Sequence, residues 1–237
     1  MRAYLIILLL SFSWSMSESD RFSKKVEYEY SVYIDLLNIK IGGASLSIKE
    51  SGNIEGRDVY HLNFSVKTSK LGDRIYKIRN KIDVWIDKKN LNVVRQEKNI
   101  RELRKKKNSI TSIQGELATT NGKKYIINKN TFDPYSLLLI LPEFEIPEET
   151  SKRFNIVDAG TVREIELTNE GFSKTRTPYG TFLAYTLTPS KNDDSILKNK
   201  GDMEVSYALI GENLIPIEIL IKLGQGVISL RLKKVHE

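Results

Sequence analysis

Residues 215–232 read IPIEILIKLGQGVISLRL, and this stretch decides the class of fold. Apolar residues recur at every second position on both sides of Gly224-Gln225-Gly226. Such alternation is typical of half-buried β-strands, and a glycine-rich break between two runs is typical of a hairpin turn. The stretch therefore predicts two antiparallel strands joined by a short turn.

The same alternation recurs along most of the chain, separated by turn signals such as Ser51-Gly52-Asn53 and Asn121-Gly122. Regularly spaced short strands of this kind indicate an antiparallel meander. We expect a mainly β fold, a curved antiparallel sheet or barrel of about a dozen strands. The clearest further runs are 26–34, 60–66, 82–86, 183–187 and 205–209.

Gly42-Gly43 interrupts one of these runs, because the apolar positions change from odd numbers before the glycines to even numbers after them. A strand changes parity when it carries an extra residue, and glycine supplies the positive φ that a bulge often needs. We expect residues 39–49 to form one strand bent by a glycine bulge, with Gly43 intolerant of a β-branched side chain. The alternative is a plain hairpin turn at the glycines.

Residues 132–142, FDPYSLLLILP, differ from the rest of the chain. Asp133 is a suitable N-cap, Pro134 suits the first helical position, and Pro142 ends the pattern. The sequence therefore predicts one short helix, apolar on all sides, that must be covered on every side. We expect it to act as a lid or plug, with the side away from the sheet facing a second layer, a partner or a ligand.

Residues 1–17 resemble a secretory signal. Arg2 precedes a ten-residue apolar run, 3–12, that is shorter than the roughly 20 residues of a membrane-spanning helix. We expect cleavage near Glu18, one β-rich domain over 18–237, and a periplasmic location in a Gram-negative type of envelope. An uncleaved anchor or a buried helix is the alternative. No later stretch is long enough to predict a transmembrane span in the mature chain.

The composition excludes several classes of function. The chain has no cysteine, so disulfides, thiolate metal sites and cysteine nucleophiles are ruled out. Its net charge is +7, but the lysines are scattered, whereas a nucleic-acid interface needs clustered charge with stacking aromatics. We therefore expect no nucleic-acid partner.

The search for catalytic or metal-binding motifs is negative. The two histidines, His61 and His236, have no acidic residue or second histidine at ligand spacing. The sequence contains no G-x-S-x-G, phosphate-binding or dinucleotide-binding motif. Four glutamates within 143–149, near Asp133, could supply paired carboxylates for acid–base work, but a solvated acidic loop is the far commoner explanation. We therefore expect no catalytic residue, no metal, no cofactor and no enzymatic activity.

Two sets of residues are candidates for binding. The first could line a cavity for an apolar ligand, although at β spacing such residues are more often plain core. The second is the densest basic run, which could contact anionic headgroups, cell-wall polymer or an envelope protein partner. Its alternative is a charged edge hairpin that discourages aggregation. The ligand candidates are Tyr30, Phe64, Trp85, Leu138 and Ile140, and the surface candidates are Arg101, Arg104, Lys105, Lys106 and Lys107.

Four segments, in this order, resemble an exported bacterial family called domain of unknown function 3108. They are YEYSVYIDLLNIKIGGASLSI (28–48), FDPYSLLLIL (132–141), TPYGTFLAYTLTP (177–189) and LIPIEILIKLGQGVISLRLKK (214–234). The resemblance implies a curved antiparallel sheet or barrel, and it supplies no activity, cofactor or catalytic residue. At the level of the fold alone, a curled sheet with a helix near its open face is similar to periplasmic lipoprotein carriers.

These observations favour a non-catalytic binding module for an apolar or lipid-like ligand, held by the concave face of the sheet. The alternative is a structural or interaction protein of the cell envelope, with a filled barrel and no small-molecule ligand. A hydrolase with a dispersed active site is a third reading. The first two differ in whether the interior of the barrel is hollow.

Overall fold

The structure is a computed structural model that describes residues 22, 25–190, 202–223 and 226–236. Residues 1–17, where a signal peptide is expected, lie outside the described residues. No helix in the described part of the chain is both long enough and apolar enough to cross a membrane.

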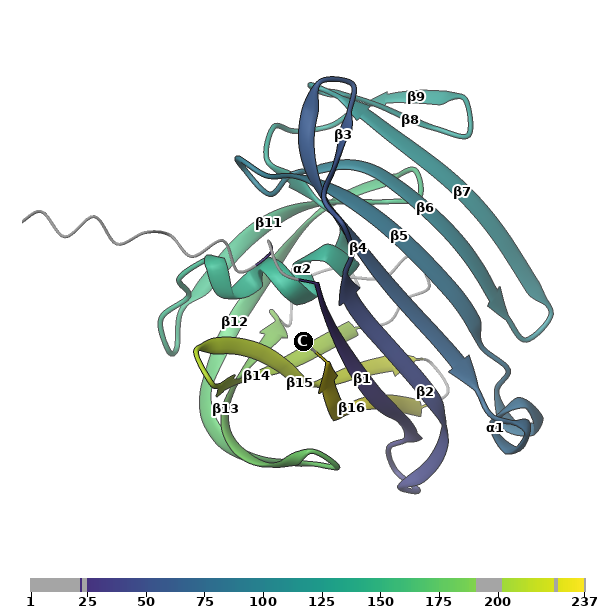
Figure 1. Ribbon diagram of the computed structural model, residues 1–237, viewed down its shortest axis with the longest axis vertical. Helices are drawn as coiled ribbons and strands as arrows, with labels where there is room; N and C mark the ends of the chain where they lie inside the picture. The colour runs from purple at the N-terminus through teal and green to yellow at the C-terminus, as the bar shows by residue number, and fades with distance from the viewer. Residues whose placement is uncertain (1–21, 23–24, 191–201, 224–225, 237) are drawn as a thin grey trace, which may run out of the picture.

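Sixteen strands in the described residues join into one sheet (Figure 1). The spatial order is β10-β11-β12-β13-β14-β15-β16-β1-β2-β4-β5-β6-β7-β8-β9, and β3 pairs with β4. Neighbouring strands are antiparallel except for the short β10–β11 pair. The strands are β1 (Val26–Ile34), β2 (Ile39–Ile48), β3 (Gly52–Ile54), β4 (Arg57–Thr68), β5 (Arg79–Asp87), β6 (Val93–Glu102), β7 (Lys105–Gln114), β8 (Leu117–Thr120), β9 (Lys123–Ile126), β10 (Thr131–Phe132), β11 (Ser151–Asp158), β12 (Thr161–Thr177), β13 (Gly180–Pro189), β14 (Asp202–Ile210), β15 (Asn213–Leu223) and β16 (Gly226–His236).

The predicted fold class is confirmed, because one large curved antiparallel sheet makes up most of the structure. The strand count exceeds the expected dozen or so because β3, β8, β9 and β10 contain only two to four residues each. Strands that short cannot be recognised in the sequence, because they are too short to show the alternation of apolar and polar residues. The long stripe is correctly located, since Ile215, Ile217 and Ile219 are all buried on β15.

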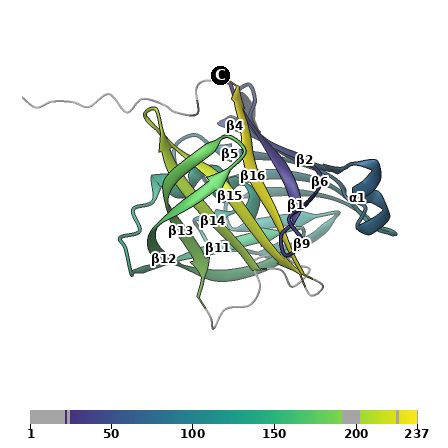
Figure 2. The ribbon, with the colours of Figure 1, turned by 90° about the horizontal axis from the view of Figure 1, so that it is seen from below.

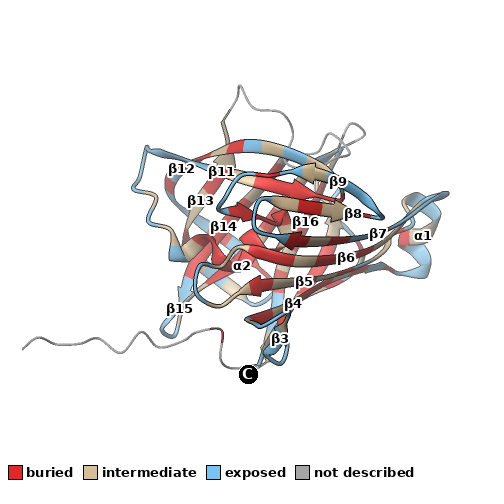
Figure 3. Cartoon of the chain, turned by 90° about the horizontal axis from the view of Figure 1, so that it is seen from above, coloured by how far each residue is buried: buried red, intermediate tan, exposed pale blue. Residues whose placement is uncertain are grey.

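The sheet curls around a central helix, α2 (Pro134–Ile140), as Figure 1 shows, and Figure 2 shows the curled sheet from a second direction. Apolar side chains on the concave face meet there to form the core. Buried positions follow the strands around α2, and exposed positions concentrate at the hairpin ends (Figure 3). The C-terminal strand β16 pairs with β1, so the two ends of the described chain meet in the middle of the sheet.

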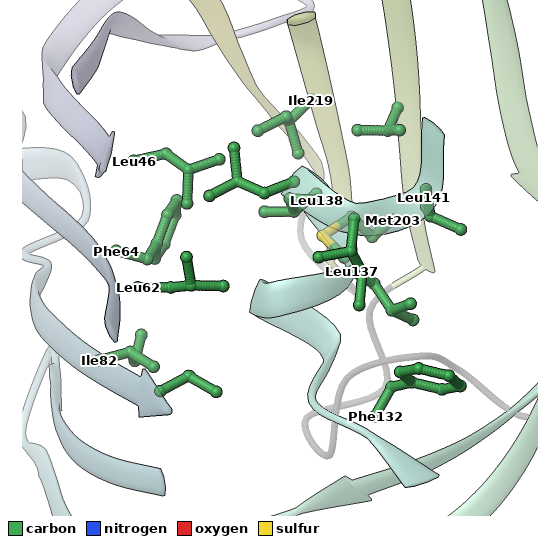
Figure 4. Close-up of a cluster of buried hydrophobic side chains, with 14 of the residues drawn as sticks. Leu46, Leu62, Phe64, Ile82, Phe132, Leu137, Leu138, Leu141, Met203 and Ile219 are labelled. Atoms are coloured by element: carbon green, nitrogen blue, oxygen red, sulfur yellow. The ribbon is translucent and has the colours of Figure 1, made fainter. Parts of the chain in front are cut away.

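Helix α2 begins at Pro134, as the sequence predicts, because Asp133 accepts hydrogen bonds from the backbone N–H groups of Tyr135 and Ser136. A 3-10 turn, 141–143, follows it. Five consecutive apolar residues, 137–141, are buried. In Figure 4, Leu137 and Leu138 lie beside Met203, and Leu62 and Phe64 lie on one side of this group.

The sheet therefore covers more than one side of α2, which contacts β5, β11 and β15. On the β14 side, the Tyr207 hydroxyl also donates to the Leu138 carbonyl at 3.1 Å. The expectation that one side of the helix needs a separate layer, partner or ligand is thus wrong, because the curled sheet supplies the cover. The helix fills the centre of the barrel-like sheet instead of closing it from outside.

Strand β2 is continuous through Gly42-Gly43, which confirms the predicted bulge over the alternative hairpin turn. Val32 pairs with Gly42 and Tyr33 with Lys40, so Ile41 is the extra residue. Neither glycine has a positive φ, so that part of the expectation is wrong. Gly42 is required instead by close approach, because a Cβ there would lie 2.4 Å from the Lys67 carbonyl oxygen.

A second short helix, α1 (Lys70–Ile75), connects β4 to β5. Its N-cap is Ser69, whose hydroxyl accepts a hydrogen bond from the Gly72 backbone N–H. The Ser69 N–H donates to the carbonyl of Ile41, the extra residue of the β2 bulge, at 2.7 Å. The bulge therefore fixes α1 against the end of β2.

Candidate functional site

The concave face of the sheet encloses a cavity of about 110 Å³ beside α2. One wall is apolar and comes mainly from β4, β15 and β16. The facing wall, from β6, β7 and the end of β11, carries most of the polar groups. The lining residues are Phe64, Val66, Tyr76, Ile78, Asn80, Lys98, Ile100, Glu102, Lys107, Ser109, Tyr135, Asp158, Ala159, Ile221, Ile228 and Leu230.

Strand alternation brings these side chains together. Phe64 and Val66 lie on the inward positions of β4, and Lys98 and Ile100 lie on the inward positions of β6. The ring of Tyr135, at the start of α2, contacts the ring of Phe64 with centroids 5.0 Å apart. The helix thus forms the inner end of the cavity, and the strands form its sides.

A buried charge cluster stands where the cavity meets α2. The Lys98 ammonium donates to Asp133 Oδ2 at 2.5 Å and to Asp158 Oδ1 at 2.8 Å. It also lies 4.8 Å from the centre of the Tyr135 ring, a distance at which a cation is attracted to an aromatic face. Asp133 therefore serves both as the cap of α2 and as a partner of Lys98.

The electrostatics of this cluster keep Lys98 protonated. Burial opposes the charged ammonium, but Asp133 and Asp158 outweigh it and raise the pKa of Lys98. Burial also raises the pKa of Asp133 above its usual range, against the attraction of Lys98. Burial also tends to raise the pKa of Asp158, but the attraction of Lys98 is stronger there, so the pKa of Asp158 lies below its usual range. Lys98 is a fixed cation, which suits neither a general base nor a nucleophile.

The predicted ligand residues occupy different environments. Phe64 lines the cavity. Tyr30 is buried in the core, where its hydroxyl donates to the Pro216 carbonyl at 2.8 Å. Leu138 and Ile140 are buried within α2 and do not line the cavity. Trp85 lies on the outer face, where it stacks on His61 with ring centroids 4.5 Å apart.

The predicted surface residues flank the turn between β6 and β7. Arg101, Lys105 and Lys106 line an outer groove of about 830 Å³. Arg104 is exposed in the turn itself, and Lys107 faces the inner cavity instead. The hairpin thus presents cations to both faces of the sheet.

The other titratable candidates are separated from this cavity. His61 bonds to Asp83 on the outer face at 2.9 Å, and His236 bonds to Glu29 at 2.7 Å. The glutamates of 143–149 are exposed, whereas Asp133 is fully buried. Within the described residues, no three His, Cys, Asp or Glu side chains are grouped so as to hold a metal ion.

Sequence reasoning missed Lys98 and Asp158, which are 60 residues apart. For Lys98, the sequence did contain a signal, namely a charged residue at an inward position of a strand. Gln96, Lys98 and Ile100 share one face of β6. Asp158, which directly precedes the β11–β12 turn, looks like an ordinary turn residue. Only the tertiary structure brings the two together.

A family model described as "Protein of unknown function (DUF3108)" matches residues 29–233, nearly the whole chain. Among solved structures, the fold is similar to a crystal structure of a β-barrel-like protein of domain of unknown function DUF1849 from Brucella abortus. That similarity has a TM-score of 0.54 at 9% sequence identity and covers 90% of this chain and 97% of the other. No curated protein matches the chain.

Proposed function

The chain belongs to the DUF3108 family, and we propose that it is a non-catalytic binding protein whose inner cavity takes the end of an apolar or lipid-like chain. The observation that carries this proposal is the cavity itself, with its apolar wall from β4, β15 and β16. Lys107, at the outer end of the cavity, would suit a ligand with an anionic group. The protonated, doubly paired Lys98 supports a binding role over a catalytic one.

The size of the cavity limits what it takes. Its volume is about 110 Å³, whereas sites for drug-sized ligands have about 300–1,000 Å³. We therefore propose that it receives the terminal part of a single chain and not a whole phospholipid. The rest of such a ligand would extend past Tyr76, Glu102 and Lys107 at the outer end of the cavity.

Equilibrium binding of a fluorescent medium-chain fatty acid tests this proposal. Ile100→Trp should fill the cavity and weaken binding at least ~10-fold, because excluding a few methylenes removes about 0.8 kcal/mol each. Ile110→Trp is the matched control, since Ile110 is exposed on the neighbouring strand and does not line the cavity. Equal affinity of the two folded variants would contradict the proposal.

The filled centre of the barrel favours a second candidate, a structural or interaction protein without a small-molecule ligand. Its support is that α2 occupies the interior, and the cavities beside it are small, at about 110 and 20 Å³. The same titration distinguishes the two candidates. A folded wild-type protein with no saturable fatty-acid binding would favour the interaction protein.

We also propose that the protein acts outside the cytoplasm, in the periplasm. The support is the sequence pattern of residues 1–17, a positively charged start followed by a short apolar run. N-terminal sequencing of protein recovered from a periplasmic fraction should give a chain that begins near Glu18. Recovery of intact Met1 from the membrane fraction would contradict export with cleavage.

A further inference from the structure

Large apolar side chains are exposed at one end of the sheet. Leu36 and Leu37 lie in the β1–β2 turn and are 90% and 60% exposed. Leu71 and Ile75 on α1 and Leu103 in the β6–β7 turn are each about half exposed. We call these five residues the apolar rim. These exposed side chains are not part of the hydrophobic core. Clusters of exposed apolar side chains mark interaction sites.

Backbone hydrogen bonds link the three segments that carry the apolar rim. The Ser69 N–H, at the start of α1, donates to the carbonyl of Ile41 at 2.7 Å, and Ile41 lies in β2 just after the turn that carries Leu36 and Leu37. On the other side of α1, the Leu103 N–H donates to the Lys77 carbonyl at 2.8 Å. Figure 1 shows α1 and the β1–β2 turn toward the lower right.

Basic side chains surround the apolar rim without acidic partners. Lys40, Lys70, Arg74, Lys77 and Arg104 are exposed, and none forms an ion pair with a described residue. Of the nearby carboxylates, Asp73 pairs with Arg79 at 2.7 Å, Asp35 pairs with Arg231 at 2.8 Å, and Glu102 accepts a hydrogen bond from Asn80 at 2.7 Å. This end of the molecule therefore has a surplus of positive charge.

The outer groove of about 830 Å³ adjoins the same end. Seven Lys or Arg side chains line it, including Lys67, Lys77, Arg101 and Lys106, while its described lining includes no Asp or Glu. Leu103 of the apolar rim also lines this groove. Basic and apolar groups thus lie together where the groove meets the apolar rim at Leu103.

We propose that this surface docks on an anionic lipid bilayer. The leucines of the apolar rim insert among the acyl chains, while the lysines and arginines contact the headgroup phosphates. Peripheral membrane binding has this composition, with apolar burial and attraction to anionic lipid acting together. A soluble polyanion would use the cations but would leave Leu36 and Leu37 in water.

Docking in this way would bring the inner cavity to the membrane. Tyr76, which directly follows α1, and Glu102 and Lys107, which flank the β6–β7 turn, line the outer end of that cavity. The docking proposal rests on the surface alone, so it can fail or succeed independently of ligand binding in the cavity.

Co-sedimentation of the purified protein with vesicles tests the proposal. We expect binding to vesicles of phosphatidylcholine with phosphatidylglycerol, and much weaker binding to phosphatidylcholine alone. The double variant Leu36→Ser/Leu37→Ser should bind about ten-fold more weakly, because less apolar surface is buried. Lys77→Glu/Lys106→Glu should bind at least ~25-fold more weakly, since each basic residue near the surface contributes about five-fold. The protein's fold should be unchanged, because all four side chains are exposed.

Matched variants on other surfaces serve as controls. Leu183→Ser/Leu209→Ser removes two leucines of β13 and β14 that are 65% and 64% exposed, and Lys123→Glu/Lys124→Glu reverses two exposed charges on β9. Both should bind like the wild type. The proposal is overturned if the wild type does not bind anionic vesicles, or if the controls weaken binding as much as the rim variants. It is also overturned if only the charge reversal matters and a soluble polyanion binds equally well.

Discussion

At the scale of single residues, Lys98 is a buried cation that neutralises two buried carboxylates, Asp133 and Asp158. Lys98→Met should lower the free energy of unfolding by about 3–5 kcal/mol, since it leaves Asp133 and Asp158 without a counter-charge. Urea denaturation measures this loss. The triple variant Lys98→Met/Asp133→Asn/Asp158→Asn should recover most of it. A single variant within about 1 kcal/mol of the wild type would contradict the burial of this cluster.

Asp83 gives the fold a measurable dependence on pH. Burial favours its neutral form, but hydrogen bonds from His61, Asn63 and Lys81 prevail and lower its pKa to about 2. A carboxyl group whose pKa is lower in the folded state stabilises the fold above the unfolded pKa, near 3.9, and this contribution is lost as the pH falls toward 2. Asp83→Asn should therefore lose less stability than the wild type between about pH 4 and pH 2. An equal loss of stability by the wild type and by Asp83→Asn across that pH range would refute this role.

Gly42 and Gly43 form a natural pair of test and control. A Cβ at Gly42 would lie 2.4 Å from the Lys67 carbonyl oxygen, whereas at Gly43 the nearest atom is 3.6 Å away. Gly42→Ala should destabilise the fold by about 1–3 kcal/mol through overpacking. Gly43→Ala should be neutral or slightly stabilising, because it restricts the unfolded chain. Thermal denaturation that ranks the two variants in the opposite order would contradict the geometry of the bulge.

At the scale of elements, α2 links the two sides of the curled sheet through its packing. Leu139 is fully buried, so Leu139→Ala should cost about 2–5 kcal/mol. Leu183→Ala removes the same atoms from a side chain that is 65% exposed and should change stability by less than about 0.5 kcal/mol. Similar denaturation midpoints for the two variants would mean that α2 does not form part of the core.

The sequence predicts elements well where local chemistry defines them. Asp133-Pro134 and Pro142 bound α2 correctly, because capping and proline geometry act within a few residues. Strands with one buried face, such as β15, appear as alternation. The helix α1 was not predicted, because six residues with a central glycine carry little helical periodicity, and tertiary contact with Ile41 decides its position.

At the scale of the whole molecule, the long-range contacts decide the candidate site. Curvature could be expected from the meander and the bulge, but not that the sheet would enclose α2 on opposite sides. The inward direction of Lys98 and its meeting with Asp158 depend on strand pairing far apart in the sequence. Trp85 is a case that the local sequence could have placed. It occupies a polar position in the alternation of its strand, and its side chain accordingly lies on the outer face.

The central claim, that the inner cavity holds the end of an apolar chain, is tested most directly by photo-crosslinking. The purified protein would be labelled with a medium-chain fatty acid that carries a terminal diazirine, and the modified residues located by mass spectrometry. We predict label on cavity residues such as Phe64, Ile100 and Tyr135, which excess unlabelled fatty acid suppresses. Label confined to outer-face residues such as Trp85 or Leu183, or no competed label at all, would contradict the claim.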